Sequence, residues 1–338
     1  MNIKENLSLK KYNTFGIDVK AKYFAEVFSI DELRELLSLD KYKVLPKFIL
    51  GGGSNILFTT DFEGLVIKIS SNEIQVIKED NDYVFIKALA GINWHDLVLY
   101  CIERNFGGIE NLSLIPGKVG AAPIQNIGAY GQELKDVFYS LNGIFIDNLE
   151  EKSFYKDECR FAYRNSIFKT ELKNAFIITD VTLILNKQPL PNTSYGAIEE
   201  ELKKRNLDRI TIKDVSKAVC DIRMIKLPDP AKIGNAGSFF KNPEISENKF
   251  EELKGKFPGI IGYNTAENII KVPAGWLIEN AGLKGKRIGN TGTHPKQALV
   301  IVNYGNATGE EILQYKDFVK EKIFERFGIE LEEEVNVV

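Results

Sequence analysis

The sequence predicts an α+β protein of two or three domains. A length of 338 residues is long for a single hydrophobic core. The first third of the chain alternates β-branched apolar runs with glycine-rich stretches, which is typical of strands joined by tight turns. The last third adds a strand-like run to a long amphipathic helix. Helices and strands in both parts indicate the α+β class.

Three strands and one helix are expected in the first third. The helix lies in WHDLVLYCIERNFGG, where Leu97, Cys101 and Ile102 recur at helical spacing before two glycines that are typical of a helix end. The strands are apolar runs bounded by Gly, Asp or Asn. The expected ranges are 47–50, 64–69 and 83–91 for the strands and 94–108 for the helix.

A long strand and two helices are expected in the middle of the chain. The strand is AFIITDVTLIL at 175–185, a loop containing PLPNTSYG follows, and the helices are expected at 196–206 and 211–224. The next stretch, KLPDP at 226–230, contains two prolines, which interrupt regular structure. We take it as the last domain boundary.

The final third is expected to form a small α+β domain. Its strand is ALVIVN at 298–303, and Thr308 with Glu311 forms a capping box that begins a helix. The helix is expected to run to Gly328. Its apolar face consists of Ile312, Phe318, Val319, Ile323 and Phe327.

The composition is that of an ordinary globular enzyme or binding protein. Hydrophobic residues make up 44% of the chain, charged residues 27%, and the net charge is −3. Nucleic acid is not expected as a partner because the chain has no excess of positive charge. Nothing in the sequence requires an oligomer.

The cysteines and the apolar runs predict a cytoplasmic protein. Cys101, Cys159 and Cys220 are odd in number and widely spaced, which suits reduced thiols better than disulfides and provides no metal-ligand spacing. The N-terminal stretch MNIKENLSLKKYNTFG lacks the apolar core of a signal peptide. No run approaches the roughly 20 apolar residues of a membrane span, so neither a membrane nor a metal is expected as a partner.

Two glycine-rich segments are candidate phosphate-binding loops. They are LGGGSN at 50–55 and LIPGKVGAAPIQNIGAYG at 114–131. Glycines let backbone N–H groups approach phosphate oxygens closely, so either segment could hold a pyrophosphate. The alternative is a pair of tight turns, since neither segment matches the dinucleotide fingerprint or the P-loop.

Ser238, in GNAGSFFKNP at 234–243, is a candidate functional hydroxyl. A hydrolase nucleophile would need the pattern Gly-x-Ser-x-Gly and a nearby histidine base. The residue two positions after Ser238 is Phe240, and the chain has only His95 and His294, both expected to be structural. A helix cap or a turn residue is therefore favoured over a hydrolase nucleophile.

Eight motifs in order resemble the UDP-N-acetylenolpyruvoylglucosamine reductase family, also called UDP-N-acetylmuramate dehydrogenase. The resemblance covers nearly the whole chain. The matching segments are NTFG (13–16), LGGGSNILF (50–58), AGINWHDLV (90–98), IENLSLIPGKVGAAPIQNIGAYGQEL (109–134), CRFAYRNSIFK (159–169), GNAGSFFKNP (234–243), PAGWLIENAGLKG (273–285) and LEEEV (331–335).

The resemblance implies a flavoenzyme of bacterial peptidoglycan synthesis. Its fold would be the FAD-binding fold of the vanillyl-alcohol oxidase and p-cresol methylhydroxylase type, with two α+β subdomains, plus a C-terminal α+β substrate domain. The expected ranges are 1–70 and 71–225 for the two subdomains, the second joined by a C-terminal strand at 329–338, and 226–328 for the substrate domain. FAD is expected to be bound non-covalently, because the chain has few histidines and cysteines.

The implied reaction passes hydride from NADPH through FAD to the enolpyruvyl ether of UDP-N-acetylglucosamine-enolpyruvate, giving UDP-N-acetylmuramate. Hydride would reach the terminal enol carbon and a proton the adjacent one. The residues expected to hold FAD are Gly51, Gly52, Gly53, Ser54, Asn55, Gly117, Gly120, Ala121, Gln125, Asn126, Gly128, Ala129 and Tyr130.

Three residues are implied as catalytic by the resemblance. Ser238 would donate the proton, and Arg164 would face the substrate carboxylate with its planar guanidinium. Glu334 matches the family's C-terminal glutamate, and a strand at 329–338 would direct it away from the apolar side chains. Its alternative is a solvated face. Glu333 stands where the family has a proline, on the apolar side of this alternation.

The substrate contacts are also implied by resemblance. Tyr195 matches the tyrosine that closes over the UDP-sugar in the longer class of these enzymes. The full set is Tyr163, Tyr195, Lys226, Asn242, Tyr263, Lys284 and Gln297, with surface lysines as the alternative for the two lysines. Two other functions remain open, a non-catalytic flavin or nucleotide-sugar binding protein and a flavin oxidase of the same fold.

Overall fold

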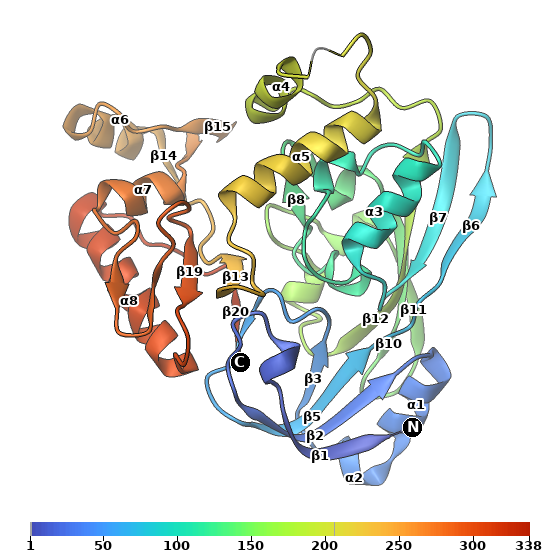
Figure 1. The fold of residues 1–338 in the computed structure, drawn as a ribbon. Helices are drawn as coiled ribbons and strands as arrows, with labels where there is room; N and C mark the ends of the chain where they lie inside the picture. Colours follow the sequence, from blue (N-terminus) through green and yellow to red (C-terminus); the bar gives the residue numbers. More distant parts are fainter. Residues whose placement is uncertain (1, 206) are drawn as a thin grey trace. The chain divides into compact units, whose positions relative to one another are not determined.

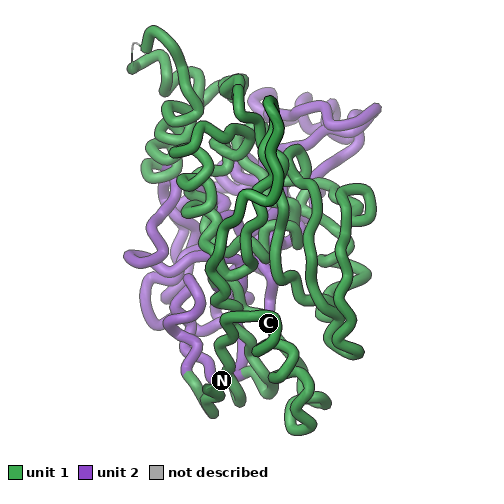
Figure 2. Tube along the Cα trace, turned by 90° about the vertical axis from the view of Figure 1, so that its right-hand side faces the viewer, with its two compact units in different colours: residues 1–7, 21–52, 62–225 green, residues 8–20, 53–61, 226–338 purple. Residues whose placement is uncertain are grey.

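The computed structural model describes residues 2–205 and 207–338. The chain divides into two compact units, coloured separately in Figure 2. Unit 1 consists of residues 1–7, 21–52 and 62–225, and unit 2 of residues 8–20, 53–61 and 226–338. The chain enters the last part of unit 2 at Lys226, where the KLPDP stretch begins.

Unit 1 contains a four-stranded sheet in the order β1-β2-β5-β3. The strands are β1 (Ile3–Ser8), β2 (Lys20–Val27), β3 (Lys47–Leu50) and β5 (Phe62–Ile69), and both β2 and β3 run parallel to β5. Helix α1 (Ile30–Ser38) packs on it through Leu33 and Leu36, and the short α2 (Asp40–Lys43) follows. The expected strands at 47–50 and 64–69 are confirmed, because both runs supply buried apolar side chains to this core.

A five-stranded antiparallel sheet forms the rest of the core of unit 1. Its order is β11-β10-β12-β7-β6, with β6 (Ile74–Glu79), β7 (Tyr83–Leu89), β10 (Phe138–Phe145), β11 (Glu151–Tyr155) and β12 (Phe176–Asn186). Helix α3 (Trp94–Glu103) lies over it in Figure 1, with Trp94, Leu97 and Cys101 buried against the sheet. The expected helix end at 108 is wrong by five residues. The helix stops earlier because Asn105 adopts a positive φ of 58°, and Gly107 instead pairs with Asn186 of β12.

Two further helices complete unit 1. They are α4 (Gly196–Lys203) and α5 (Ile212–Lys226), which pack together through Ile198, Leu202, Val215 and Val219. Both expected helices are confirmed, although position 206 of the first lies outside the described residues. The periodic apolar residues of each helix form this shared contact.

Two small sheets of unit 2 have four and three strands. The first has the order β13-β19-β18-β17, with β13 (Gly234–Ser238), β17 (Arg287–Ile288), β18 (Thr291–Thr293) and β19 (Val300–Asn303). The second has the order β14-β16-β15, with β14 (Glu244–Ser246), β15 (Tyr263–Ala266) and β16 (Ile269–Lys271). Helices α6 (Glu247–Lys256) and α7 (Ala274–Asn280) belong to the same unit.

Helix α8 (Gly309–Phe327) packs against β18 and β19 and is the long helix that the sequence predicts (Figure 1). Its capping box is confirmed, since Glu311 N–H donates to the Thr308 hydroxyl at 3.1 Å and Thr308 N–H donates to the Glu311 carboxylate at 2.7 Å. The helix ends at Gly328, which adopts a positive φ of 62°.

The C-terminal segment is less regular than expected. In place of a strand over 329–338 it forms β20 (Asn336–Val337), parallel to β4 (Ile56–Leu57), and a single bridge between Glu333 and Phe240. The apolar alternation nevertheless holds for Ile329, Leu331 and Val335, which are buried. The segment is fixed by its partners on both sides rather than by membership of a continuous sheet.

Candidate active site

Within unit 1, the first part of one glycine-rich segment, at Gly51 and Gly52, contacts the other segment. A Cβ placed on Gly52 would lie 3.0 Å from the Cα of Gly117. A Cβ placed on Gly51 would lie 3.6 Å from the Cβ of Ala121. Gly117 adopts a φ of 125°, which favours glycine. Backbone from two distant parts of the chain therefore comes into direct contact at Gly52 and Gly117, where a side chain at position 52 would require the neighbouring backbone to shift.

Hydrogen bonds hold the second segment at the start of α3. Gly117 O accepts from Trp94 N–H at 3.1 Å, and Val119 N–H donates to Ile92 O at 2.9 Å. The backbone N–H groups of Gly52, Gly53 and Ser54, by contrast, donate to no acceptor in the described part of the chain. Glycine-rich backbone with unused donors is a suitable site for a pyrophosphate, so the residues present fit FAD.

The predicted cofactor residues after Ala121 form a tight hairpin in unit 1. Its strands are β8 (Gly128–Ala129) and β9 (Gln132–Glu133). Asn126 is buried, and its side chain donates to Glu133 and to Ala162 O while accepting from Lys135 N–H. The Asn126 side chain thus organises the hairpin.

Arg164 is bound to this hairpin. Its guanidinium donates to Gly128 O at 2.7 Å, and the Tyr163 ring lies 5.5 Å from the guanidinium carbon. Arg164 itself adopts a positive φ of 53°, an uncommon conformation that often occurs at functional positions. The structure thus brings two predicted residues, Tyr163 and Arg164, to the predicted cofactor hairpin.

Arg223 of α5 belongs to the same cluster, and our sequence reasoning missed it. Its Nε donates to Leu114 O at 3.2 Å. Burial lowers the pKa of the Arg223 guanidinium, while the neighbouring Tyr130 raises it through charge interaction and a hydrogen bond. Its position was visible in the sequence, because helical spacing from Val215 and Val219 places residue 223 on the buried face of α5. Arg223 is half-buried there, and a half-buried arginine at such a position indicates a function or a partner.

The loop that carries Tyr195 is tied to the hairpin. The Tyr195 and Tyr130 rings meet edge to face with centroids 5.3 Å apart. The Asn111 side chain donates to Tyr130 O and to Asn192 O, each at 3.0 Å. Tyr195 itself is half exposed, so it can contact both the hairpin and a ligand.

Ser238 ends β13 in unit 2, and its position is fixed by the two phenylalanines that follow it. Phe239 and Phe240 are fully buried, and Phe239 N–H donates to Leu299 O at 2.8 Å. The pairing of β13 with β19 is irregular before Ser238, where Gly237 adopts a φ of 72°. The hydroxyl is thus carried on a bent, glycine-containing strand end that is anchored by buried aromatic rings.

Glu334 lies beside Ser238. Its backbone N–H donates to Phe239 O at 2.8 Å, so the two predicted catalytic residues are on adjacent backbone segments. Asn55, predicted from the first glycine-rich segment, donates from its side chain to Glu334 O at 3.2 Å. Asn336 N–H donates back to Asn55 O at 3.1 Å. Three residues far apart in the sequence therefore meet in unit 2.

Glu333 reaches helix α8 and pairs with two of its lysines. Its carboxylate lies 2.9 Å from the Lys320 Nζ and 3.3 Å from the Lys316 Nζ. Burial alone would raise the pKa of the Glu333 carboxyl, but the hydrogen bonds from these lysines hold the pKa below its ordinary value. The glutamate on the apolar side of the alternation is accommodated because it is paired.

The predicted substrate-binding residues of unit 2 lie on different segments of that unit. The Asn242 side chain accepts from Ala274 N–H at 3.0 Å and so caps α7. Lys284 pairs with Glu279 at 2.7 Å, and Gln297 lies near Gly275. Tyr263, on β15, is exposed. Lys226, the last residue of α5, is exposed as well.

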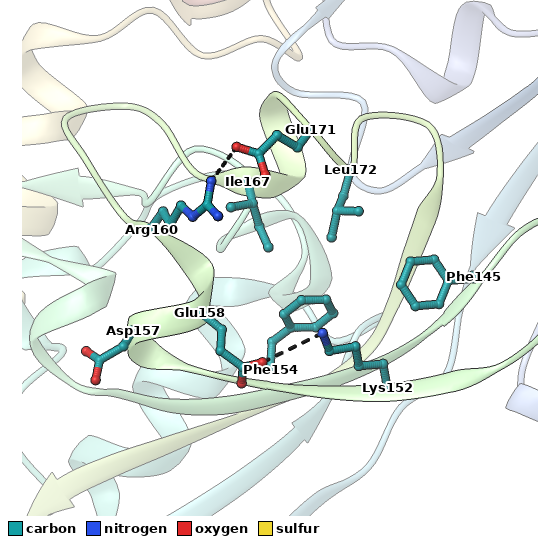
Figure 3. A pocket seen from close by; sticks show the side chains of 9 residues that line it. All are labelled: Phe145, Lys152, Phe154, Asp157, Glu158, Arg160, Ile167, Glu171 and Leu172. Carbon is teal, nitrogen blue, oxygen red and sulfur yellow. Dashed lines mark hydrogen bonds and ion pairs between the residues drawn. The ribbon is translucent and has the colours of Figure 1, made fainter.

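One hollow of about 560 Å³ lies elsewhere in unit 1 (Figure 3). Apolar side chains including Phe154 and Leu172 line it, and two ion pairs, Lys152 with Glu158 and Arg160 with Glu171, stand at its rim. None of the predicted site residues lines it. It is therefore a feature separate from the candidate active site.

Two features are absent among residues 2–205 and 207–338. No group of three or more His, Cys, Asp and Glu side chains in these ranges is arranged to hold a metal ion. None of the helices in the described part of the chain has both the length and the apolar character needed to cross a membrane.

Comparison with known proteins matches both parts of the chain. Residues 21–144 match the family model of an FAD binding domain, and residues 229–338 match that of the UDP-N-acetylenolpyruvoylglucosamine reductase C-terminal domain. The reductase of Flavobacterium johnsoniae is 55% identical over 100% of both chains. The reductase of Amoebophilus asiaticus is 49% identical, again over 100% of both, and that of Pseudomonas aeruginosa is 44% identical over 100% of this chain and 99% of its own.

A solved structure shows the same fold. The UDP-N-acetylenolpyruvylglucosamine reductase of Thermus caldophilus superposes with a TM-score of 0.68 at 24% identity, covering 100% of this chain and 99% of the other. The predicted α+β fold with an FAD-binding domain is confirmed. With relatives this similar over their full length, the chain belongs to the UDP-N-acetylenolpyruvoylglucosamine reductase family.

Proposed function

We propose that this protein is a cytoplasmic, FAD-dependent reductase that uses NADPH to convert UDP-N-acetylglucosamine-enolpyruvate into UDP-N-acetylmuramate for peptidoglycan synthesis. The observation that carries the proposal is the 55% identity to a named reductase over the whole of both chains. An FAD-binding domain model and the family's own C-terminal domain model match separate parts of the same chain.

The two glycine-rich segments would hold the cofactor. Bound FAD would accept hydride from NADPH and deliver it to the terminal carbon of the enolpyruvyl group. The unused backbone donors of Gly52, Gly53 and Ser54 would bind the pyrophosphate without a lysine. The hairpin at 128–133 would contact the rest of the cofactor through its backbone, because the Asn126 side chain is already bonded within the protein.

Ser238 would donate a proton to the carbon adjacent to the terminal carbon that receives the hydride. A serine hydroxyl is a weak acid near pH 7, and general acids work best when their pKa matches the pH. The carbon that receives the proton is strongly basic once hydride has been added, so placement matters more than acid strength. The buried Phe239 and Phe240 supply that placement, because they fix the strand end that carries the hydroxyl.

Arg164 and Glu334 would both assist this proton transfer, Arg164 at the substrate and Glu334 at Ser238. Arg164 would bind the substrate carboxylate, where negative charge develops, and fixed cationic groups of this kind contribute strongly to catalysis. Glu334, adjacent to Ser238 through the Phe239 O bond, would orient the hydroxyl or return a proton to it after each turnover.

The remaining predicted residues would bind the nucleotide sugar. Lys226 and Lys284 suit phosphate as point charges, and the amides of Asn242 and Gln297 suit sugar or uracil. Tyr263 is exposed and can stack or donate. Tyr195 would close over the UDP-sugar, as in the longer class of these enzymes, while its loop stays tied to the hairpin through Asn111.

An anaerobic flavin experiment tests this function. The purified protein is expected to be yellow, to lose its flavin absorbance on addition of NADPH, and to regain it only when the enolpyruvyl UDP-sugar is added. Recovery of colour in air but not with the UDP-sugar would indicate a flavin oxidase. A yellow protein that NADPH does not bleach would indicate a flavin-binding protein without this activity.

A further inference from the structure

Leu114 has an unusual backbone conformation at the entrance to the second glycine-rich segment. Its φ is 58°, in the left-handed region that disfavours a branched side chain. The residue stands three positions before Gly117, whose backbone contacts Gly52. A strained residue persists only where its surroundings hold it, so the question is what holds Leu114.

Two side chains hold the Leu114 backbone from opposite sides. The Leu114 N–H donates to Nδ1 of His95 at 3.0 Å, and Leu114 O accepts from Nε of Arg223 at 3.2 Å. His95 is on the first turn of α3 and Arg223 near the end of α5. The turn is further held by Trp94, whose indole N–H donates to Leu112 O at 2.9 Å. The direction of the chain into the segment is therefore set by α3 and α5.

The bond to His95 requires a neutral ring. Nδ1 can accept a backbone N–H only when it carries no proton, so the ring proton must be on Nε2. Burial lowers the pKa of His95, the Arg223 charge lowers it further, and the neighbouring Asp96 raises it. The environment thus favours the form of the ring that the bond needs.

We propose that His95 is a positioning residue for FAD: by accepting from Leu114 N–H it keeps the segment at 115–121 in the shape that receives the cofactor. This inference rests on the proposed function in one respect, that FAD is the ligand of the segment. His95 acts through the backbone of Leu114, and its effect falls on the affinity for FAD. Without the bond, Leu114 relaxes from its strained conformation and the segment must be ordered when FAD binds.

The test is the dissociation constant of FAD, measured from recovery of flavin fluorescence when the holoenzyme is diluted. His95→Leu removes the acceptor and is expected to weaken FAD binding about tenfold, the effect of losing one hydrogen bond to a part-buried donor. His95→Asn places an oxygen where Nδ1 was and is expected to stay within about threefold of the wild type. The far-ultraviolet circular dichroism of each variant confirms that it is folded.

A second substitution tests the strain directly. Asparagine tolerates positive φ and is close to leucine in size. Leu114→Asn in the His95→Leu background is therefore expected to recover most of the lost affinity. His294→Leu is the matched control, because His294 also accepts a backbone N–H, from Lys296, but in an exposed turn of unit 2.

Each outcome has a distinct meaning. If His95→Leu binds FAD as tightly as the wild type, or if His95→Asn is as weak as His95→Leu, the positioning role is wrong while the proposed function stands. If the wild-type protein does not bind FAD, the proposed function fails and takes this inference with it. Weak binding by His95→Leu together with recovery by Leu114→Asn supports the inference.

Discussion

At the scale of single residues, the candidate site depends on a few side chains that fix backbone for others. Phe239 and Phe240 are buried so that Ser238 is held, Asn55 is bonded to the backbone of Glu334, and Asn126 holds the hairpin near Arg164. In each case a supporting side chain determines where a candidate catalytic residue lies. The sequence motifs named the candidate residues, whereas these supporting contacts required the structure.

Glu333 gives a prediction for pH-dependent stability. Its lysine partners hold the pKa of its carboxyl below the ordinary value, so the ion pairs stabilise the fold above about pH 4.5 and this contribution is lost as the pH falls through the lowered pKa. Glu333→Gln is expected to lower stability by about 1 kcal/mol at pH 7, since the carboxylate is about one quarter exposed and its partners are on the same unit.

The measurement is the thermal unfolding midpoint of both proteins between pH 3 and pH 7. The gap between wild type and Glu333→Gln is expected to be constant above about pH 5 and to narrow below it. Glu332→Gln is the control, because that glutamate is three quarters exposed and pairs only with Lys241 among the described residues. A gap that widened as the pH fell would contradict the pairing.

At the scale of elements, the parts of the fold that could be predicted are those with a strong local signal. The strands β3 and β12 are nearly continuous apolar runs, and α8 has both a capping box and a glycine end. Most residues of strands β6 and β11 are exposed, and many of them are polar. The sequences of these two strands therefore resemble those of loops. The C-terminal segment was misjudged because its partners, Phe240 and β4, are distant in the sequence.

The start of α8 gives an element-scale prediction. The Thr308 hydroxyl accepts from Glu311 N–H, and removing an N-cap of this kind costs about 1 kcal/mol. Thr308→Ala is therefore expected to lower the midpoint of urea unfolding, whereas Thr308→Ser keeps the acceptor and is expected to match the wild type. Equal loss in both variants would mean that the methyl group of Thr308, and not its cap, stabilises the helix.

At the scale of the whole molecule, the chain passes from unit 1 into unit 2 and back again before it finally enters unit 2. Residues 8–20 and 53–61 belong to unit 2 although they interrupt the sequence of unit 1. Periodicity alone gives no sign of such an exchange, because it reports only local patterns. Arg223 was missed for a related reason, since its partners Leu114 and Tyr130 lie 109 and 93 residues earlier in the sequence.

The reactivity of the three cysteine thiols reports how tightly the folded chain is packed. Burial raises the pKa of Cys101 and of Cys159 to about 12, so neither forms a reactive thiolate at neutral pH. Cys220 is only partly buried. A colorimetric thiol reagent is expected to modify one thiol slowly in the native protein and three in denaturant. Cys220→Ser should leave the native protein unreactive, and rapid reaction at two or three native thiols would contradict this packing.

The most direct test of the account concerns Ser238 as the proton donor. In stopped-flow experiments without oxygen, Ser238→Ala is expected to keep FAD and to be bleached by NADPH as the wild type is, while reoxidation by the enolpyruvyl UDP-sugar slows about 10³-fold, a typical contribution of a general acid. Ser246→Ala, which changes another serine of unit 2 that only caps α6, is expected to leave both half-reactions unchanged. If Ser238→Ala were reoxidised by the substrate at the wild-type rate, the central claim would be wrong.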